Sequence, residues 1–193
     1  FCRRIEKKMG GKIVSLFESY GDVSCLLKEI DQVDTIVVAG PCYVNSYPAY
    51  LTFLLEELSN HPQVCHGQKL YGIINGGMPY VHTHDSGLLQ LKMFCKECQM
   101  HYMGGFVMGL GPILNGEEIE QHLNAKKYVP AFNLFCEYMK KGEYSPESVY
   151  EKAAVKMPAI MARFMSYFMS RNVDKNLISH GLDPKKESPY LSE

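Results

Sequence analysis

The stretch from residue 33 to residue 48 constrains the fold of this 193-residue chain more than any other segment. Its first part, residues 35–39, is apolar without alternation, which is typical of a strand buried on both faces of a parallel sheet. Gly40 and Pro41 end this strand, and Pro48 suits the first turn of a following helix. Ligands in open α/β sheets bind outside such strand ends. The segment therefore predicts a buried parallel strand with a candidate binding loop at its carboxyl end.

Strands and helices alternate through the first half of the chain. Apolar runs that end in or contain glycine predict strands at 34–40, 69–75 and 102–110. Apolar residues at helical spacing predict helices over 23–30, 51–58 and 85–99. This order predicts a parallel sheet with helices on both of its faces.

From Pro112 onward the pattern becomes helical. We therefore expect an α/β core over residues 1–111 and a C-terminal helical extension of the same domain over 112–171. The polar residues 172–193 are expected to form an extended tail, because glycine and prolines interrupt them.

Composition excludes several classes of partner. The formal net charge is −1, from 20 basic and 21 acidic residues, so no global field attracts nucleic acid or an anionic membrane. No apolar stretch approaches the roughly 18 residues that a spanning helix needs. Seven scattered cysteines, an odd number, do not form a disulfide framework and favour reduced thiols. We expect a cytoplasmic protein that binds neither nucleic acid nor membrane.

The order of motifs resembles the flavodoxin-like NAD(P)H-dependent FMN reductase family over about residues 23–110. The resemblance rests on the apolar strand, the loop Gly-Pro-Cys-Tyr-Val-Asn-Ser-Tyr-Pro at 40–48, the amphipathic helix, and the second strand ending Asn-Gly-Gly at 75–77. It implies a three-layer flavodoxin-like parallel sheet with FMN as cofactor and NAD(P)H as co-substrate. The electron acceptor would be a small molecule such as a quinone, a nitro or azo compound, or free flavin.

In that family, the two loops hold the isoalloxazine ring largely through backbone N–H groups. The resemblance places Pro41, Tyr43, Val44, Asn45 and Ser46 on one side of the ring, and Gly76, Gly77, Met78 and Tyr80 on the other. The residue types agree with this independently, because glycine permits close backbone approach and tyrosine offers a stacking surface. Since the cofactor carries the chemistry, no side chain is assigned as a catalytic acid or base.

The chain departs from the family pattern at its start. The family has a phosphate-binding loop rich in Ser, Thr and Asn after its first strand, and no such strand and loop precede Val23. We therefore expect the α/β core to be N-terminally incomplete, with strand 34–40 lying between an upstream strand and strand 69–75. No residue can be named for the FMN phosphate.

Two other functions stay open. A flavin-free flavodoxin-like module for binding or assembly would explain the missing phosphate loop. A thiol-disulfide oxidoreductase would use Cys95 and Cys98, but reactive pairs lie at a helix N-terminus, and this pair ends its helix on the apolar face. We expect Cys95 and Cys98 to be buried thiols without a bound metal.

Two further groups of residues allow more than one interpretation. His82 and His84 either contact the flavin edge or substrate, or they are solvated loop histidines with Asp85 capping the next helix. The apolar residues around Phe164 and Phe168 spread over more than a narrow stripe, which favours a homodimer contact over core packing or a lid on the flavin.

Overall fold

The computed structural model describes residues 1–18, 23–114, 116–155 and 158–183. The chain divides into two compact units, Phe1–Val155 and Lys156–Glu193. The first unit contains helices α1 (Cys2–Met9), α2 (Ser24–Ile30), α3 (Ala49–Asn60), α4 (Ser86–Glu97), α5 (Ala125–Lys141) and α6 (Ser148–Glu151), strands β1 (Thr35–Pro41), β2 (Lys69–Asn75) and β3 (His101–Met108), and short 3-10 turns η1 (Pro62–Val64), η2 (Val81–Thr83), η3 (Gly111–Leu114) and η4 (Ile119–Gln121). The second unit contains α7 (Ala159–Ser179).

The three strands form one parallel sheet in the order β1-β2-β3. Pairing runs from Thr35 opposite Lys69 to Pro41 opposite Asn75, and β3 pairs with the other edge of β2. The register of β2 and β3 shifts between Leu70 and Gly72. Since all strands are parallel, their carboxyl ends meet at one edge of the sheet.

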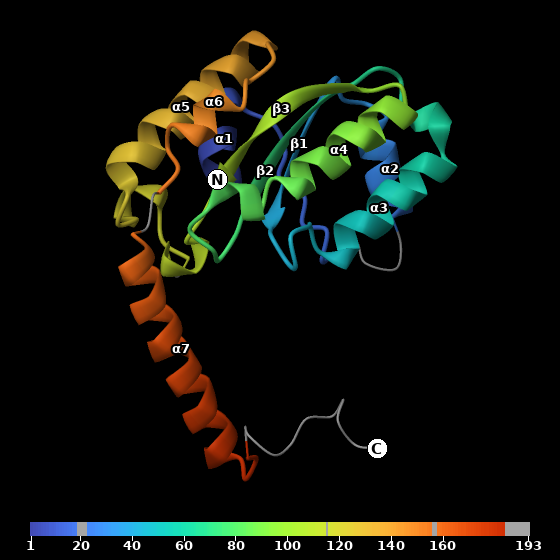
Figure 1. Cartoon of the computed structure of the whole chain (residues 1–193). Coiled ribbons are helices and arrows are strands. Elements are labelled where there is room, and N and C mark those ends of the chain that lie inside the picture. Colours follow the sequence, from blue (N-terminus) through green and yellow to red (C-terminus); the bar gives the residue numbers. More distant parts are fainter. Residues whose placement is uncertain (19–22, 115, 156–157, 184–193) are drawn as a thin grey trace. The chain divides into compact units, whose positions relative to one another are not determined.

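Helices cover both faces of the sheet (Figure 1). On one face, Leu88 and Leu91 of α4 pack where Gly72 of β2 has no side chain. On the other face, Phe106 of β3 lies 5.2 Å from Phe132 of α5 between ring centroids. The predicted order of strands and helices and the three-layer arrangement agree with the structure.

The position of β1 differs from the prediction. Among the described residues no strand pairs with its outer edge, so β1 is an edge strand, and the interior position expected for strand 34–40 is wrong. Its five central side chains are half-buried, whereas the five central residues of β2 are buried. Both strands are apolar because helices lie over both faces, and this composition does not distinguish an edge strand from a central one.

Helix α1 occupies the place where the sequence analysis expected no element. It packs on the α5 face: the Phe1 ring lies 4.9 Å from the Phe132 ring, and Ile5 is buried. Arg4 bonds Glu120, and its guanidinium also donates to Asn133 at 3.2 Å. The N-terminal residues therefore extend the hydrophobic core beyond α5.

Tyr47 joins the loop after β1 to the middle of the sheet. Its side chain is 4% exposed, and its hydroxyl donates to the Ile73 carbonyl at 3.1 Å. Gly40 and Gly87 leave the space for its ring, since a Cβ at either position would lie 3.1 Å from a ring carbon. Burial raises the pKa of Tyr47 well above its usual value, so the hydroxyl stays protonated and able to donate.

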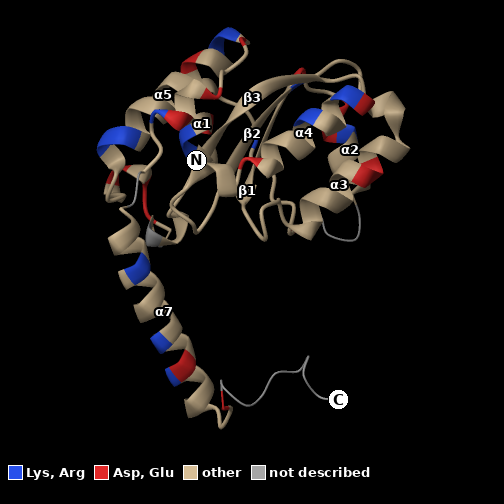
Figure 2. Ribbon diagram, viewed as in Figure 1, with Lys and Arg blue, Asp and Glu red and all other residues tan. Residues whose placement is uncertain are grey.

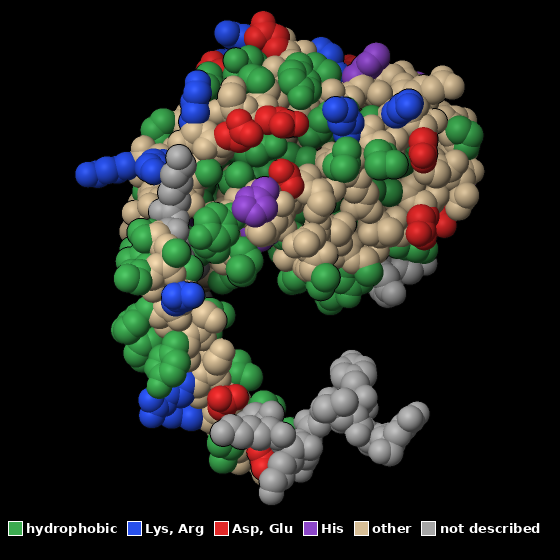
Figure 3. Space-filling model, in the orientation of Figure 1, with side chains coloured by type: hydrophobic (Ala, Val, Ile, Leu, Met, Phe, Trp, Pro, Cys, Tyr) green, Lys and Arg blue, Asp and Glu red, His purple; other side chains and the backbone are tan. Residues whose placement is uncertain are grey.

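The second unit, taken by itself, is a single helix with apolar residues on much of its surface. No residue of α7 is buried, and Ile160, Phe164 and Phe168 are all exposed. Figure 3 shows hydrophobic side chains along its length, and Figure 2 shows that charges are sparse on it. The helix continues to Ser179, so an extended tail from residue 172 is wrong for its first eight residues; residues 184–193 lie outside the described part.

The boundary after Val155 falls inside the stretch 112–171 that the sequence analysis treated as one helical extension. None of the described helices is long and apolar enough to cross a membrane.

Replacing Tyr47 should weaken the fold in two graded steps. Tyr47→Phe removes one buried hydrogen bond and should lower the free energy of unfolding by about 1 kcal/mol. Tyr47→Ala leaves a cavity and should cost about 3–5 kcal/mol. Urea unfolding measures both, and Tyr43→Phe is the control because Tyr43 is 64% exposed. A Tyr47→Ala variant as stable as wild type would show that this side chain does not fix the loop.

The exposed face of α7 leads us to expect a homodimer in which a second copy covers it. Wild-type protein should have the mass of a dimer in light-scattering chromatography at micromolar concentration. Phe164→Glu with Phe168→Glu should shift it to monomer, while Ser166→Glu with Ser170→Glu, on the polar side of the same helix, should not. A monomeric wild type would contradict the dimer.

Candidate functional site

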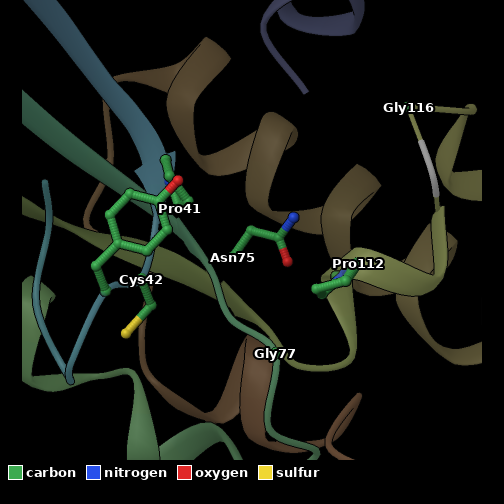
Figure 4. Close-up of a pocket in the computed structure, with 8 residues that line it drawn as sticks. Pro41, Cys42, Asn75, Gly77, Pro112 and Gly116 are labelled. Carbon is green, nitrogen blue, oxygen red and sulfur yellow. The ribbon is translucent and has the colours of Figure 1, made fainter. Parts of the chain in front are cut away.

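The candidate site lies at the carboxyl edge of the sheet, where the three loops that follow β1, β2 and β3 meet. A cavity of about 370 Å³ opens there, within the range of small-molecule sites. It is lined by Pro41, Cys42 and Tyr43 after β1, Asn75 and Gly77 at the end of β2, and Gly111, Pro112 and Gly116 after β3 (Figure 4). The side chains among these residues carry no formal charge, so the cavity suits a neutral, flat ligand surface.

The loop after β1 is a tight hairpin held to β2. The Cys42 amide donates to the Asn75 carbonyl at 2.7 Å, and the Tyr43 amide donates to the Ser46 carbonyl at 2.7 Å. Both central residues of the turn have positive φ, 50° at Val44 and 65° at Asn45. This is the turn type that matches strand twist, but a β-branched residue at positive φ is strained. Val44 is 98% exposed, so its side chain does not form a wall of the cavity.

The loop after β2 rests on His84. A Cβ at Gly76 would lie 2.1 Å from the His84 ring, so only glycine allows this contact. His84 is 3% exposed, and its Nε2 lies 3.0 Å from the Met78 carbonyl oxygen. The interpretation of both histidines as solvated loop residues is therefore wrong for His84, which supports the loop from below. His82 is exposed and stacks on Tyr80 with ring centroids 5.6 Å apart, and Asp85 precedes α4 without a side-chain capping bond.

The loop after β3 packs directly on the loop after β2 through backbone atoms. The Leu110 amide donates to the Met78 carbonyl at 3.1 Å, and the Gly111 amide donates to the Gly76 carbonyl at 2.9 Å. A Cβ at Gly109 would lie 2.5 Å from the Met78 oxygen. Tyr128 of α5 donates its hydroxyl hydrogen to the Gly109 carbonyl at 3.3 Å, which ties this loop to the core.

Hydrogen-bonding groups at the cavity are left for a ligand. Among the described residues, nothing accepts a hydrogen bond from the amides of Gly77 and Met78. Asn75 Oδ1 is buried and likewise has no partner in the described part of the chain. Gly77 is exposed, and a Cβ there would meet only Pro112, at 3.8 Å. These features fit an aromatic ring with a polar edge.

The structure brings some of the predicted site residues to the cavity and places others beside it. Pro41, Tyr43 and Gly77 line it. Val44 and Asn45 form the exposed hairpin turn, Ser46 bonds Gln90 at 2.8 Å, Gly76 packs against His84, Met78 is exposed, and Tyr80 stacks on His82.

Five lining residues were not predicted: Cys42, Asn75, Gly111, Pro112 and Gly116. A signal for the third loop exists in the sequence, because β3 also runs into closely spaced glycines at 109 and 111. Burial raises the pKa of the Cys42 thiol, so Cys42 contributes a neutral wall rather than a nucleophile.

A separate group of thiols lies where α4 ends. Cys95 is buried, as expected, but Cys98 is half-buried and its sulfur lies 3.6 Å from the Ser59 hydroxyl oxygen, so full burial of this pair is wrong. Burial raises the pKa of Cys95 to about 12 and that of nearby Cys65 to about 11. Thiols with such pKa values are poor nucleophiles near neutral pH. Within the described ranges, no group of three or more His, Cys, Asp or Glu side chains could hold a metal ion.

No family model and no curated protein matches this sequence. Solved structures match its fold. General stress protein 14 from Treponema denticola, in complex with FMN, superposes with a TM-score of 0.52 at 16% identity, over 71% of this chain and 85% of that chain. An NADPH-quinone reductase from P. pentosaceus gives 0.50 at 14% identity, over 69% and 85%. A flavone reductase gives 0.50 at 12% identity, over 74% of this chain and 58% of that chain, so the chain spans less than two thirds of that protein.

Likeness at these identities shows the fold alone. It confirms the expected α/β class, a flavodoxin-like parallel sheet with helices on both faces.

The buried thiols provide a test that needs no ligand. At about pH 8, a group with a pKa of about 11 is roughly 0.1% thiolate, so Cys65 and Cys95 should resist iodoacetamide in the native protein. The exposed Cys2 and Cys25 should react first, as peptide mass spectrometry will show. Labelling of Cys65 should rise about tenfold per pH unit while the fold persists. Labelling of Cys95 as fast as Cys2 would contradict its burial.

Proposed function

We propose that this chain binds FMN at the strand-end cavity and is an oxidoreductase that passes electrons from NAD(P)H to a small-molecule acceptor. The observation that carries the proposal is the cavity itself: uncharged walls at the carboxyl ends of parallel strands, with unused hydrogen-bonding groups on one loop. The fold supports it, since one structural neighbour is an FMN complex and another is an NADPH-quinone reductase.

The residues at the cavity have separate roles in this proposal. The Gly77 and Met78 amides donate to the carbonyl edge of the ring system. Tyr43 offers a flat surface, and Pro41 and Pro112 limit water at the edges. The backbone bonds from Leu110 and Gly111 hold these donors in place before a ligand arrives, which lowers the entropic cost of binding.

When bound, FMN supplies the redox chemistry: it takes a hydride from the nicotinamide and gives two electrons to a quinone, a nitro or azo compound, or free flavin. The chain needs no acid or base for this, and the lining residues contain no carboxylate, histidine or lysine.

One observation favours a second candidate, a flavin-free binding or assembly module. The lining residues include no Ser, Thr, Lys or Arg that could hold a phosphate. A site that recognises the ring without the phosphate would bind FMN weakly or release it during purification.

Titration of the purified chain with FMN and with riboflavin separates these candidates. Quenching of flavin fluorescence, together with NAD(P)H oxidation on addition of a quinone, would support the reductase. Equal affinity for FMN and riboflavin would show that this chain does not recognise the phosphate. Absence of binding by either flavin would rule out the reductase and leave the binding module.

Gly77→Val should lower the affinity for FMN at least tenfold. The added side chain would project beside Pro112 without a clash, so the fold should persist while space for the ring is lost. Gly77→Ala is the graded control and should have a smaller effect. The flavin titration measures affinity, and urea unfolding checks the fold; unchanged affinity in Gly77→Val would remove this loop from the site.

A further inference from the structure

Asn75 holds a buried acceptor that the protein does not use. It is the last residue of β2 and lines the cavity, and its Oδ1 has no hydrogen-bond partner among the described residues. A buried polar atom without a partner costs free energy, and most buried polar atoms in native proteins are paired. Such an atom at a cavity wall suggests that a ligand supplies the partner.

The surrounding backbone keeps the carboxamide of Asn75 at this place. A Cβ on residue 111 would lie 1.6 Å from Asn75 Oδ1 and 2.4 Å from Nδ2, so the glycine at 111 provides the space that the amide occupies. The Asn75 carbonyl accepts a bond from the Cys42 amide, which fixes the backbone from the other side. Figure 4 shows Asn75 between Cys42 and Pro112, on the wall formed by the end of β2.

The chemistry of a carboxamide defines the ligand edge that it can recognise. One planar group presents an acceptor and a donor side by side, so its complement is a ring N–H next to a ring carbonyl. Since its acceptor is unpaired in the free protein, the amide has a hydrogen bond to gain by turning toward a ligand donor.

We infer that Asn75 is a specificity-determining residue that recognises the N–H and an adjacent carbonyl of an imide, the N3–H edge of the isoalloxazine. This inference rests on the proposed function, because it assumes that a flavin occupies the cavity. Asn75 Oδ1 accepts from the ring N–H and Nδ2 donates to the ring carbonyl, so the site selects the pyrimidine end of the flavin.

The experiment compares FMN with N3-methyl-FMN, which lacks the donor. Wild-type protein should bind FMN about tenfold more tightly than the methylated analogue, the loss expected when a buried acceptor stays unpaired. Asn75→Ala should bind the two flavins with equal affinity. Asn75→Asp keeps an acceptor of similar size and should retain the preference for FMN, which separates recognition from a general disturbance of the cavity.

The outcomes distinguish this inference from the proposed function. If wild type binds FMN but shows no preference, or if Asn75→Ala keeps the wild-type preference, the role of Asn75 is wrong while the flavin site stands. If wild type binds neither flavin, the proposed function fails and the role of Asn75 fails with it. Circular dichroism of each variant confirms that it folds.

Discussion

The packing of Tyr47 into the sheet is the constraint on which the candidate site depends. Glycines of β1, β2 and α4 leave room for its ring, and its hydroxyl bonds the Ile73 carbonyl in the middle of β2. The loop that begins at Pro41 is therefore anchored at its far end as well as at the strand. Without that anchor, nothing would hold the hairpin turn at 43–46 beside the end of β2.

The same principle repeats across the site, which is built from backbone packed on backbone. Glycines at 76, 109 and 111 each lie where a Cβ would strike a neighbouring group, and two amide-to-carbonyl bonds join the last two loops. Side chains act mainly from behind: His84 lies under Gly76, and Tyr128 holds Gly109. A site of this kind offers N–H donors, close approach and neutral walls, which suits a flat cofactor that brings its own reactivity.

The sequence predicts the parts of this architecture that depend on local pattern. Strand 69–75 is predicted with its observed bounds because its apolar run is uninterrupted and glycines follow it. Helix α1 also had a local signal, since Phe1, Ile5 and Met9 recur every four residues, but the basic residues between them hide its apolar side.

What could not be predicted depends on partners far away in the chain. The edge position of β1 is a property of its neighbours and not of its own residues. The burial of His84 follows from the missing side chain at Gly76, and the unpaired oxygen of Asn75 follows from its contact with Gly111. A residue type that is common in solvated loops becomes a structural or ligand-facing residue only once the fold brings these glycines to it.

The most direct measurement of the central claim, that a flavin ring lies at the carboxyl ends of β1 and β2, is an amide NMR titration of the labelled chain with FMN. The largest chemical-shift changes should occur at residues 42–46, 75–78 and 109–112, with Gly77 among the strongest, because ring currents and new hydrogen bonds act over short distances. Changes confined to other parts of the chain, such as the surface of α3 and α4, or none at saturating FMN, would contradict it.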